Sequence, residues 1–219
     1  MSVNKTKYLE LIDYCKVHEI ELVAVSKIKP VEDILSLYNL GQRDFGENYV
    51  QEMTEKHAAL PKDIRWHFIG HLQRNKVKFI APFVHLIQGV DSLKLLKEIN
   101  KQGEKINRKI NCLLQIFIAT EETKFGLDEE ELQAVMEDYH SGGMAFVEIR
   151  GLMGMASFSD DLELVGAEFN KLRALFSKWK DDEAGFTLLS MGMTGDYKLA
   201  VENGSNMLRI GSLIFGARE

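Results

Sequence analysis

Short apolar runs alternate with longer amphipathic stretches along the whole chain of 219 residues. The short runs have the length and apolar composition of buried strands. The longer stretches carry apolar residues at three- and four-residue spacing, which is typical of helices that bury one face. The pattern predicts a first helix at residues 5–18. It then predicts eight strands, at residues 21–26, 43–46, 65–70, 84–90, 112–118, 147–155, 186–192 and 207–211.

This alternation is typical of a parallel α/β fold. Eight strand and helix units without a linker rich in Pro, Gly or Ser predict a single domain over residues 1–219. We expect a TIM-type (β/α)8 barrel with an additional N-terminal helix. The alternative is an open doubly wound sheet, which usually carries a Gly-rich fingerprint after its first strand. Here the first strand is followed by "KIKP", which has no glycine, so the barrel is favoured.

Composition narrows the function classes. The chain has 27 Lys and Arg against 33 Asp and Glu, a net charge of -6, and its basic residues form no cluster that would bind nucleic acid. No apolar run approaches the roughly 20 residues of a membrane span, and the N-terminus lacks an apolar signal core, so we expect a cytoplasmic protein. Cys15 and Cys112 show no metal-binding or disulfide spacing, and we expect two buried thiols.

Lys27, in the segment "AVSKIKP", lies where the first predicted strand ends. The carboxyl ends of the strands form the active face of a barrel, so this amine would stand at its rim. A solvated lysine beside a turn is one interpretation. An amine that forms an imine with a carbonyl compound is the other.

Two later segments resemble the halves of a phosphate-binding cup. "SMGMTGD" follows the seventh predicted strand and "RIGSLIFG" contains the end of the eighth. Glycines allow close backbone approach, and hydroxyls and helix N-termini donate hydrogen bonds to anions. The candidate residues are Ser190, Thr194, Gly211 and Ser212, although glycine and serine also serve simply as turn residues.

Arg209 lies inside the apolar strand "MLRIG", where an unpaired guanidinium would be costly to bury. It therefore needs a partner, such as a carboxylate, a ring nitrogen or a phosphate. An imine-forming Lys27, a phosphate cup and an inward arginine together describe a site for pyridoxal 5′-phosphate (PLP), with Arg209 at the pyridine nitrogen. These residues alone leave a sugar-phosphate aldolase with an imine-forming lysine in contention.

A series of motifs in fixed order resembles the pyridoxal phosphate homeostasis protein family, relatives of the N-terminal barrel of alanine racemase. The matching segments are "AVSKIKP", "FGENYVQE", "WHFIGHLQRNK", "KFG", "RGLMGM", "LSMGMTGD" and "RIGSLIFG". The resemblance spans essentially the whole chain. It implies a single-domain barrel that holds PLP as an internal aldimine at Lys27 and has no established reaction. It also implies a role in holding or delivering the cofactor and in balancing amino acid and keto acid pools.

Three further residues are expected near the cofactor. Asn48 follows the second strand and either contacts the cofactor or caps a helix. His71 stands at the end of the third strand and lines the pocket, and the strand-like "RWHFIG" speaks against a zinc pair of His67 and His71. Met193 belongs to a group of methionines at the strand ends, with Met153, Met155 and Met191, for which simple packing is favoured.

The leading function is therefore a PLP carrier or regulator of vitamin B6 metabolism and not an enzyme. An arginine at the pyridine nitrogen is a permanent cation, so the nitrogen stays unprotonated and carbanion chemistry is weak. The alternative is a PLP-dependent amino acid racemase-like enzyme, which requires a second acid or base opposite Lys27. We expect a monomer whose partners are PLP and PLP-requiring apo-enzymes, with no bound metal.

Overall fold

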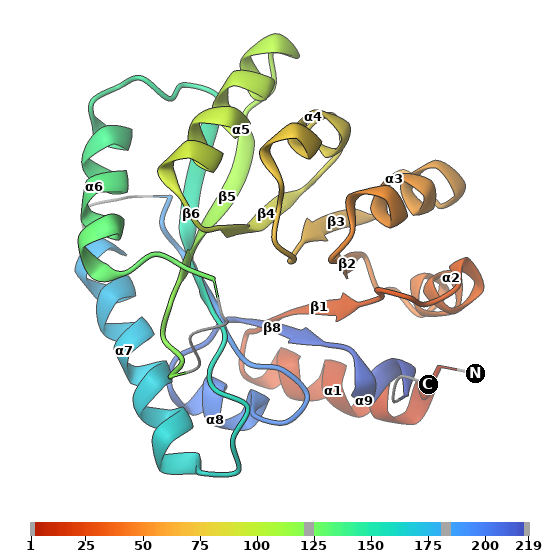
Figure 1. The fold of residues 1–219 in the computed structure, drawn as a ribbon. Coiled ribbons are helices and arrows are strands. Elements are labelled where there is room, and N and C mark those ends of the chain that lie inside the picture. Colours follow the sequence, from red (N-terminus) through yellow and green to blue (C-terminus); the bar gives the residue numbers. More distant parts are fainter. Residues whose placement is uncertain (1–2, 121–124, 181–184, 217–219) are drawn as a thin grey trace.

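Eight parallel strands form a closed barrel in the computed structural model, which describes residues 3–120, 125–180 and 185–216. Each strand pairs with the next along the chain, and β8 pairs with β1 (Figure 1). The predicted barrel is confirmed, and the open sheet is excluded. The strands are β1 (Glu21–Val25), β2 (Asp44–Glu47), β3 (Arg65–Phe68), β4 (Leu86–Val90), β5 (Ile110–Ile116), β6 (Val147–Gly154), β7 (Leu188–Ser190) and β8 (Met207–Ile210).

Helices surround the barrel (Figure 1). Those described are α1 (Lys5–Val17), α2 (Val31–Asn39), α3 (Val50–Ala59), α4 (Val77–Ile80), α5 (Leu93–Lys105), α6 (Glu129–His140), α7 (Leu162–Lys180), α8 (Tyr197–Glu202) and α9 (Ser212–Phe215), with a short 3-10 turn at Arg74–Lys76. The additional N-terminal helix is present as α1. It lies beside α9, and the Asn4 N–H donates to the Ile214 carbonyl at 2.9 Å. The two ends of the chain are thereby joined.

Helix starts follow from local sequence. The acidic run "DEEE" opens α6 with a capping box, in which the Asp128 carboxylate accepts from the Glu131 N–H and the Glu131 side chain accepts from the Asp128 N–H. Carboxylates in this first turn also complement the helix dipole. Ser92 caps α5 with a single bond, since its hydroxyl oxygen accepts from the Leu95 N–H.

The hydrophobic core has two layers. Most buried apolar side chains lie between the strands and the helices. A second, small cluster fills the barrel interior, with members Val23, Leu86, Leu113, Met153 and Met207. Cys15 and Cys112 are buried free thiols, as predicted, and burial raises the pKa of Cys15 to about 11.

The strand β7 is shorter than predicted at both ends. The sequence predicts a strand at 186–192, whereas β7 covers only 188–190. Gly192 has a φ of +97°, in the left-handed region, so the chain leaves the extended conformation before it. The Gly192 carbonyl still accepts from the Arg209 N–H at 3.1 Å, which keeps the loop close to β8.

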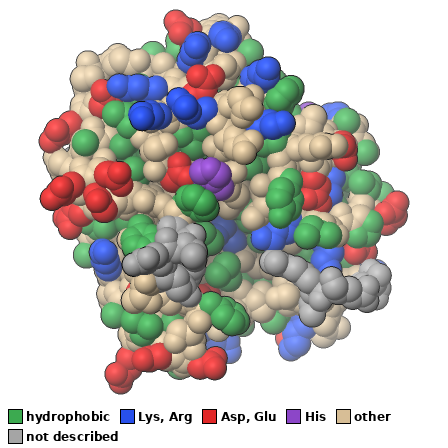
Figure 2. Space-filling view, in the orientation of Figure 1, with side chains coloured by type: hydrophobic (Ala, Val, Ile, Leu, Met, Phe, Trp, Pro, Cys, Tyr) green, Lys and Arg blue, Asp and Glu red, His purple; other side chains and the backbone are tan. Residues whose placement is uncertain are grey.

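Charged side chains of both signs cover the face shown in Figure 2. Acidic side chains gather over α6, and basic side chains gather above them over α5. No large basic surface dominates this face. No helix in the described ranges combines the length and the apolar character that a membrane span requires.

Candidate ligand site at the carboxyl ends of the strands

Lys27 lies in a tight turn directly after β1. The Lys29 N–H donates to the Ser26 carbonyl at 3.0 Å, which closes the turn, and Lys27 is partly buried within it. Ile28 has a φ of +62°. A left-handed conformation is a genuine outlier for a β-branched residue, and it persists only where the surroundings enforce it. The turn that carries Lys27 is therefore a strained element that needs support.

That support comes from β2 and α3. The Glu47 carboxylate accepts from the Ser26 hydroxyl at 2.6 Å and from the Lys56 ammonium at 2.8 Å. Lys56 also donates to the Ser26 carbonyl at 2.8 Å and to Glu52 at 2.6 Å. Glu52 in turn accepts from the Ile28 N–H at 2.6 Å. These bonds hold the backbone on both sides of Lys27.

Glu47 and Lys56 form the buried centre of this support. The Glu47 side chain is 0% exposed and that of Lys56 is 7% exposed. Burial raises the pKa of Glu47 to about 7, although Lys56 and the Ser26 hydroxyl oppose the rise. The sequence analysis assigned no role to either residue.

Arg209 lies in β8 and is buried, as its apolar context predicts. Its guanidinium donates to the Ser190 hydroxyl oxygen at 2.6 Å and to the Gly154 carbonyl at 2.8 Å. The prediction that it needs a partner is confirmed, and both of these partners are neutral. Burial lowers the pKa of Arg209 to about 10, against the opposing effect of Asp196, so the group remains a cation at neutral pH.

Three predicted contact residues lie at the end of β7 and in the loop that follows it. The Ser190 hydroxyl, on β7, is already occupied, because it accepts from Arg209 and donates to Gln88 at 2.7 Å. Met193 is exposed, and its N–H donates to the Asp196 carboxylate at 2.5 Å. Thr194 is partly buried. The phosphate cup at these residues stays a prediction.

Gly211 and Ser212 directly follow β8. Because Ala24 pairs with Ile210, the end of β8 is adjacent to the turn that carries Lys27. A Cβ at Gly211 would lie 3.3 Å from the Val25 carbonyl oxygen, which is a tight contact. Ser212 is exposed and begins α9. The two candidate cup residues and Lys27 therefore stand at neighbouring strand ends.

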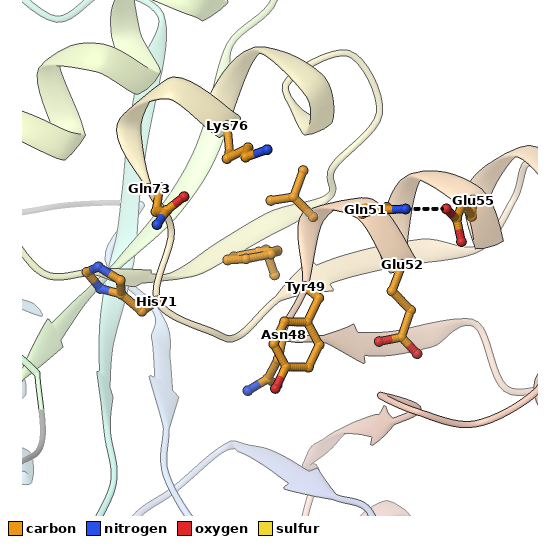
Figure 3. A pocket seen from close by; sticks show the side chains of 10 residues that line it. Asn48, Tyr49, Gln51, Glu52, Glu55, His71, Gln73 and Lys76 are labelled. Atoms are coloured by element: carbon orange, nitrogen blue, oxygen red, sulfur yellow. Dashed lines mark hydrogen bonds between the residues drawn. The ribbon is translucent and has the colours of Figure 1, made fainter.

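Asn48 follows β2 and does not cap a helix. The N-cap residue of α3 is Tyr49, and it makes no side-chain capping bond, so the capping interpretation of Asn48 is wrong. The Asn48 Oδ1 is buried and has no hydrogen-bond partner among the described residues. It borders a cavity of about 680 Å³ between α3 and the segment after β3, with Tyr49 and Lys76 also at its walls (Figure 3). A buried, unpartnered amide oxygen indicates a ligand or an ordered water.

His71 lies at the same cavity (Figure 3), and its contact with the cofactor stays a prediction. Its Nδ1 is 2.8 Å from the Asp91 carboxylate, and its ring stacks on Phe125 at 4.4 Å between centroids. His67 belongs to β3, so it and His71 do not share a helix. Two of the rim methionines, Met153 and Met191, are buried in the core, which confirms the packing interpretation for them.

A polar cluster that the sequence analysis missed occupies the opposite mouth of the barrel. The ligand-type atoms of Asp44, His67 and His85 lie within 4.8 Å of one another. His67 Nε2 is 3.0 Å from an Asp44 oxygen, and the Arg65 guanidinium bonds both oxygens of that carboxylate. The cluster is thus satisfied by internal hydrogen bonds, and a metal ion would have to displace a cation from Asp44.

The lowered pKa of Asp44 in this cluster should make the stability of the protein depend on pH. Burial by itself would raise the pKa of Asp44, but hydrogen bonds from His67 and Arg65 lower it to about 2. A depressed carboxyl pKa contributes stability above the unfolded value of 3.8, and this contribution is lost as pH falls toward 2. We expect Asp44→Asn to reduce the free energy of unfolding by about 2 kcal/mol at pH 7 and by roughly half of that at pH 3.

Urea denaturation at the two pH values measures this effect. The exposed pair of Asp63 and Arg43 provides the control, since Asp63→Asn should change the free energy of unfolding by less than about 1 kcal/mol. An equal loss for Asp44→Asn at pH 7 and pH 3 would contradict the depressed pKa.

Comparison with known sequences identifies the family. The family model described as the N-terminal domain of alanine racemase matches residues 11–219. Pyridoxal phosphate homeostasis proteins of Pasteurella multocida and Homo sapiens are 40% and 41% identical to the chain, over 91% and 90% of its length and 87% and 76% of theirs. The chain belongs to the pyridoxal phosphate homeostasis protein family.

Solved structures agree with the family assignment. PipY of Synechococcus elongatus PCC7942 with PLP bound is 32% identical, with a TM-score of 0.82 over 90% of this chain and 93% of that chain. An alanine racemase from Bartonella henselae is 19% identical, with a TM-score of 0.73 over 97% of this chain but only 59% of that chain. The homeostasis family thus shares its barrel with the racemase, and that similarity shows the fold alone.

One motif of the family resemblance is only partly visible. Lys124 of "KFG" lies outside the described residues. Phe125 is described, and its carbonyl accepts from the Gln115 side chain at 2.7 Å. Its ring also stacks on His71, so this end of the motif contacts a residue that lines the cavity.

Proposed function

We propose that this protein binds PLP at the carboxyl ends of its strands and maintains the cofactor's intracellular level by holding and delivering it. The observation that carries the proposal is the pairing of β1 with β8, which brings the supported turn of Lys27 beside Gly211 and Ser212. The PLP-bound PipY structure and the curated relatives support the same ligand.

The residues present fit PLP. Lys27 supplies the amine for covalent attachment, and its strained turn fixes the backbone that carries it. Asn48 offers a buried oxygen with no partner among the described residues, which is a feature expected of a ligand contact. Arg209 is a buried cation that donates and cannot accept, so it suits a ring nitrogen that carries no proton. Bound PLP supplies an aldehyde carbon and an electron sink.

The arrangement favours binding over turnover. A racemase-like enzyme needs a second acid or base that reaches the reacting carbon. One candidate, His71, is held by Asp91 and stacked on Phe125. Arg209 holds its protons firmly and keeps the ring nitrogen unprotonated, which weakens the electron sink. We therefore propose a carrier located in the cytoplasm, monomeric, with PLP-requiring apo-enzymes as recipients.

Deuterium exchange tests the carrier function against the racemase-like alternative. Native protein loaded with PLP is incubated with alanine in deuterated water, and exchange at Cα is followed by NMR. We expect exchange far slower than about 1 per second, the lower end of ordinary enzymes. In a parallel experiment, an apo-enzyme mixed with the loaded protein should regain activity. Rapid exchange would favour the enzyme, and failure to reactivate the apo-enzyme would contradict delivery.

A further inference from the structure

A continuous chain of hydrogen bonds crosses the interior of the barrel. It begins at Arg209 beside the proposed cofactor site, and Arg209 donates to Ser190 at 2.6 Å. Ser190 donates to Gln88 Oε1 at 2.7 Å, and Gln88 Nε2 lies 3.0 Å from His67 Nδ1. His67 Nε2 ends the chain 3.0 Å from the Asp44 carboxylate at the opposite mouth. All of these side chains except that of Asp44 are buried to 96% or more.

While His67 carries a single proton, chemistry fixes the direction of every bond in this chain. The Asp44 carboxylate only accepts, so the His67 hydrogen resides on Nε2 and Nδ1 must accept. The Gln88 amide therefore turns its NH2 group toward His67 and its Oε1 toward Ser190. Ser190 donates its hydrogen to Gln88 Oε1, and its oxygen accepts from Arg209. The protonation state of His67 thus determines how Ser190 meets Arg209 at the other end.

We propose that Ser190, Gln88 and His67 are positioning residues that hold the Arg209 guanidinium for the ring of PLP, and that a second proton on His67 weakens this hold. The proposal rests on the proposed function, since it concerns how Arg209 meets that cofactor. It gives a reason for three buried polar side chains inside the barrel. Apolar side chains could fill the same space without needing hydrogen-bond partners.

A second proton on His67 would reverse the chain. Both ring nitrogens would then donate, so the Gln88 amide would have to turn its oxygen toward Nδ1 and its NH2 group toward Ser190. The Ser190 oxygen would face two donors, Gln88 and Arg209, and its own hydrogen would lose its acceptor. The bond that fixes Arg209 would weaken, because a buried donor without an acceptor is costly.

Charged and titratable groups from several elements face His67. Asp44 of β2 accepts from His67, and Glu21 of β1 interacts with it electrostatically. Arg65 of β3 pairs with Asp44, and the ring centroid of His85 lies 5.3 Å from that of His67. Arg150 of β6 interacts with Glu21. His85 is exposed, so the solvent at this mouth reaches the cluster.

Substitutions at Gln88 test the proposal. Gln88→Met removes both bonds, whereas Gln88→Glu keeps an acceptor for Ser190. Leu86→Val is the matched control, because Leu86 fills the same interior from the same strand and makes no bond in the chain. Each variant is checked for folding by circular dichroism. Its PLP affinity is then measured, and the absorption spectrum of the bound cofactor is recorded from pH 5 to 9.

We expect Gln88→Met to bind PLP about tenfold more weakly than native protein and Leu86→Val to stay close to native. Gln88→Glu keeps the acceptor for Ser190 but loses the donor to His67, so its affinity should fall between the two. The spectrum of bound PLP should shift with pH in native protein, and this shift should disappear in Gln88→Met. A purely structural role of Gln88 would leave the pH response unchanged. Histidine ¹⁵N NMR should place the His67 proton on Nε2 in native protein at neutral pH.

The outcomes separate the two proposals. Absence of PLP binding by native protein would overturn the proposed function and this inference with it. Binding by native protein with the same affinity and pH response in Gln88→Met would overturn the inference alone. If Gln88→Met does not fold, Ser190→Ala replaces it, because this variant removes the hydroxyl that joins Gln88 to Arg209. We again expect about tenfold weaker PLP binding and no pH response of the spectrum. Native affinity and a native pH response would overturn the inference.

Discussion

Lys27→Ala is expected to abolish covalent retention of PLP and to weaken binding by at least about 100-fold, because the amine that we propose to bond the cofactor is removed. Lys27 stands on a turn whose geometry is enforced from both sides. Loaded protein is reduced with borohydride and its peptides are analysed by mass spectrometry. The added mass should fall on the peptide that contains Lys27 and be absent from the variant.

Lys29→Ala is the matched control for this experiment. Lys29 belongs to the same turn and is also partly buried, but its ammonium donates to the Phe215 carbonyl at 3.0 Å. We expect this variant to keep the cofactor on Lys27, with at most a small loss of affinity from the missing contact with α9. Retention of bound mass in Lys27→Ala, or its loss in Lys29→Ala alone, would move the attachment site to Lys29.

The fold was predictable because strand-forming runs in a parallel barrel are buried on both faces and bounded by helices with clear apolar stripes. All eight strands appear within two residues of the predicted ranges. The early end of β7 depends on the left-handed Gly192, and sequence alone does not say which glycine of a loop adopts such a conformation. Arg209 was predictable as a buried group for the converse reason, because a charge in an apolar strand must find a partner.

The support beneath the candidate site was not predictable in the same way. Glu47 and Lys56 are charged residues in a strand end and a helix, where solvent exposure is the usual outcome. One signal did exist, since Lys56 follows the buried Met53 by three residues and so shares the inward face of α3. Gln88 likewise interrupts an apolar strand. Their partners come from distant segments, and only the closed barrel brings them together.

Lys56→Met is expected to have the largest effect on stability. Lys56 neutralises the fully buried Glu47, and removal of one partner from a buried ion pair costs about 3–5 kcal/mol. That is a large part of the 5–15 kcal/mol that stabilises a typical domain. Urea denaturation followed by circular dichroism measures the loss. Lys97→Met, which removes an exposed pair with Asp138, should cost less than about 1 kcal/mol.

The loss in Lys56→Met should also grow with pH. The pKa of Glu47 is raised to about 7, mainly by burial, even with Lys56 present, and it rises further once this cation is gone. A carboxyl whose folded pKa is raised contributes its stability below the unfolded pKa and loses it as pH rises through the folded value. The difference in free energy of unfolding between native protein and Lys56→Met should therefore be smallest near pH 5 and should increase toward pH 9.

A second substitution separates the buried charge from simple loss of packing. Glu47→Gln in the Lys56→Met background removes the uncompensated carboxylate, so the double variant should regain part of the lost stability and lose its pH dependence. It should not regain PLP affinity, because Lys56 also holds the Ser26 carbonyl at the base of the Lys27 turn. Equal stability of the single and double variants at pH 9 would contradict a buried Glu47 charge. Native PLP affinity in the double variant would show that the turn needs no support from Lys56.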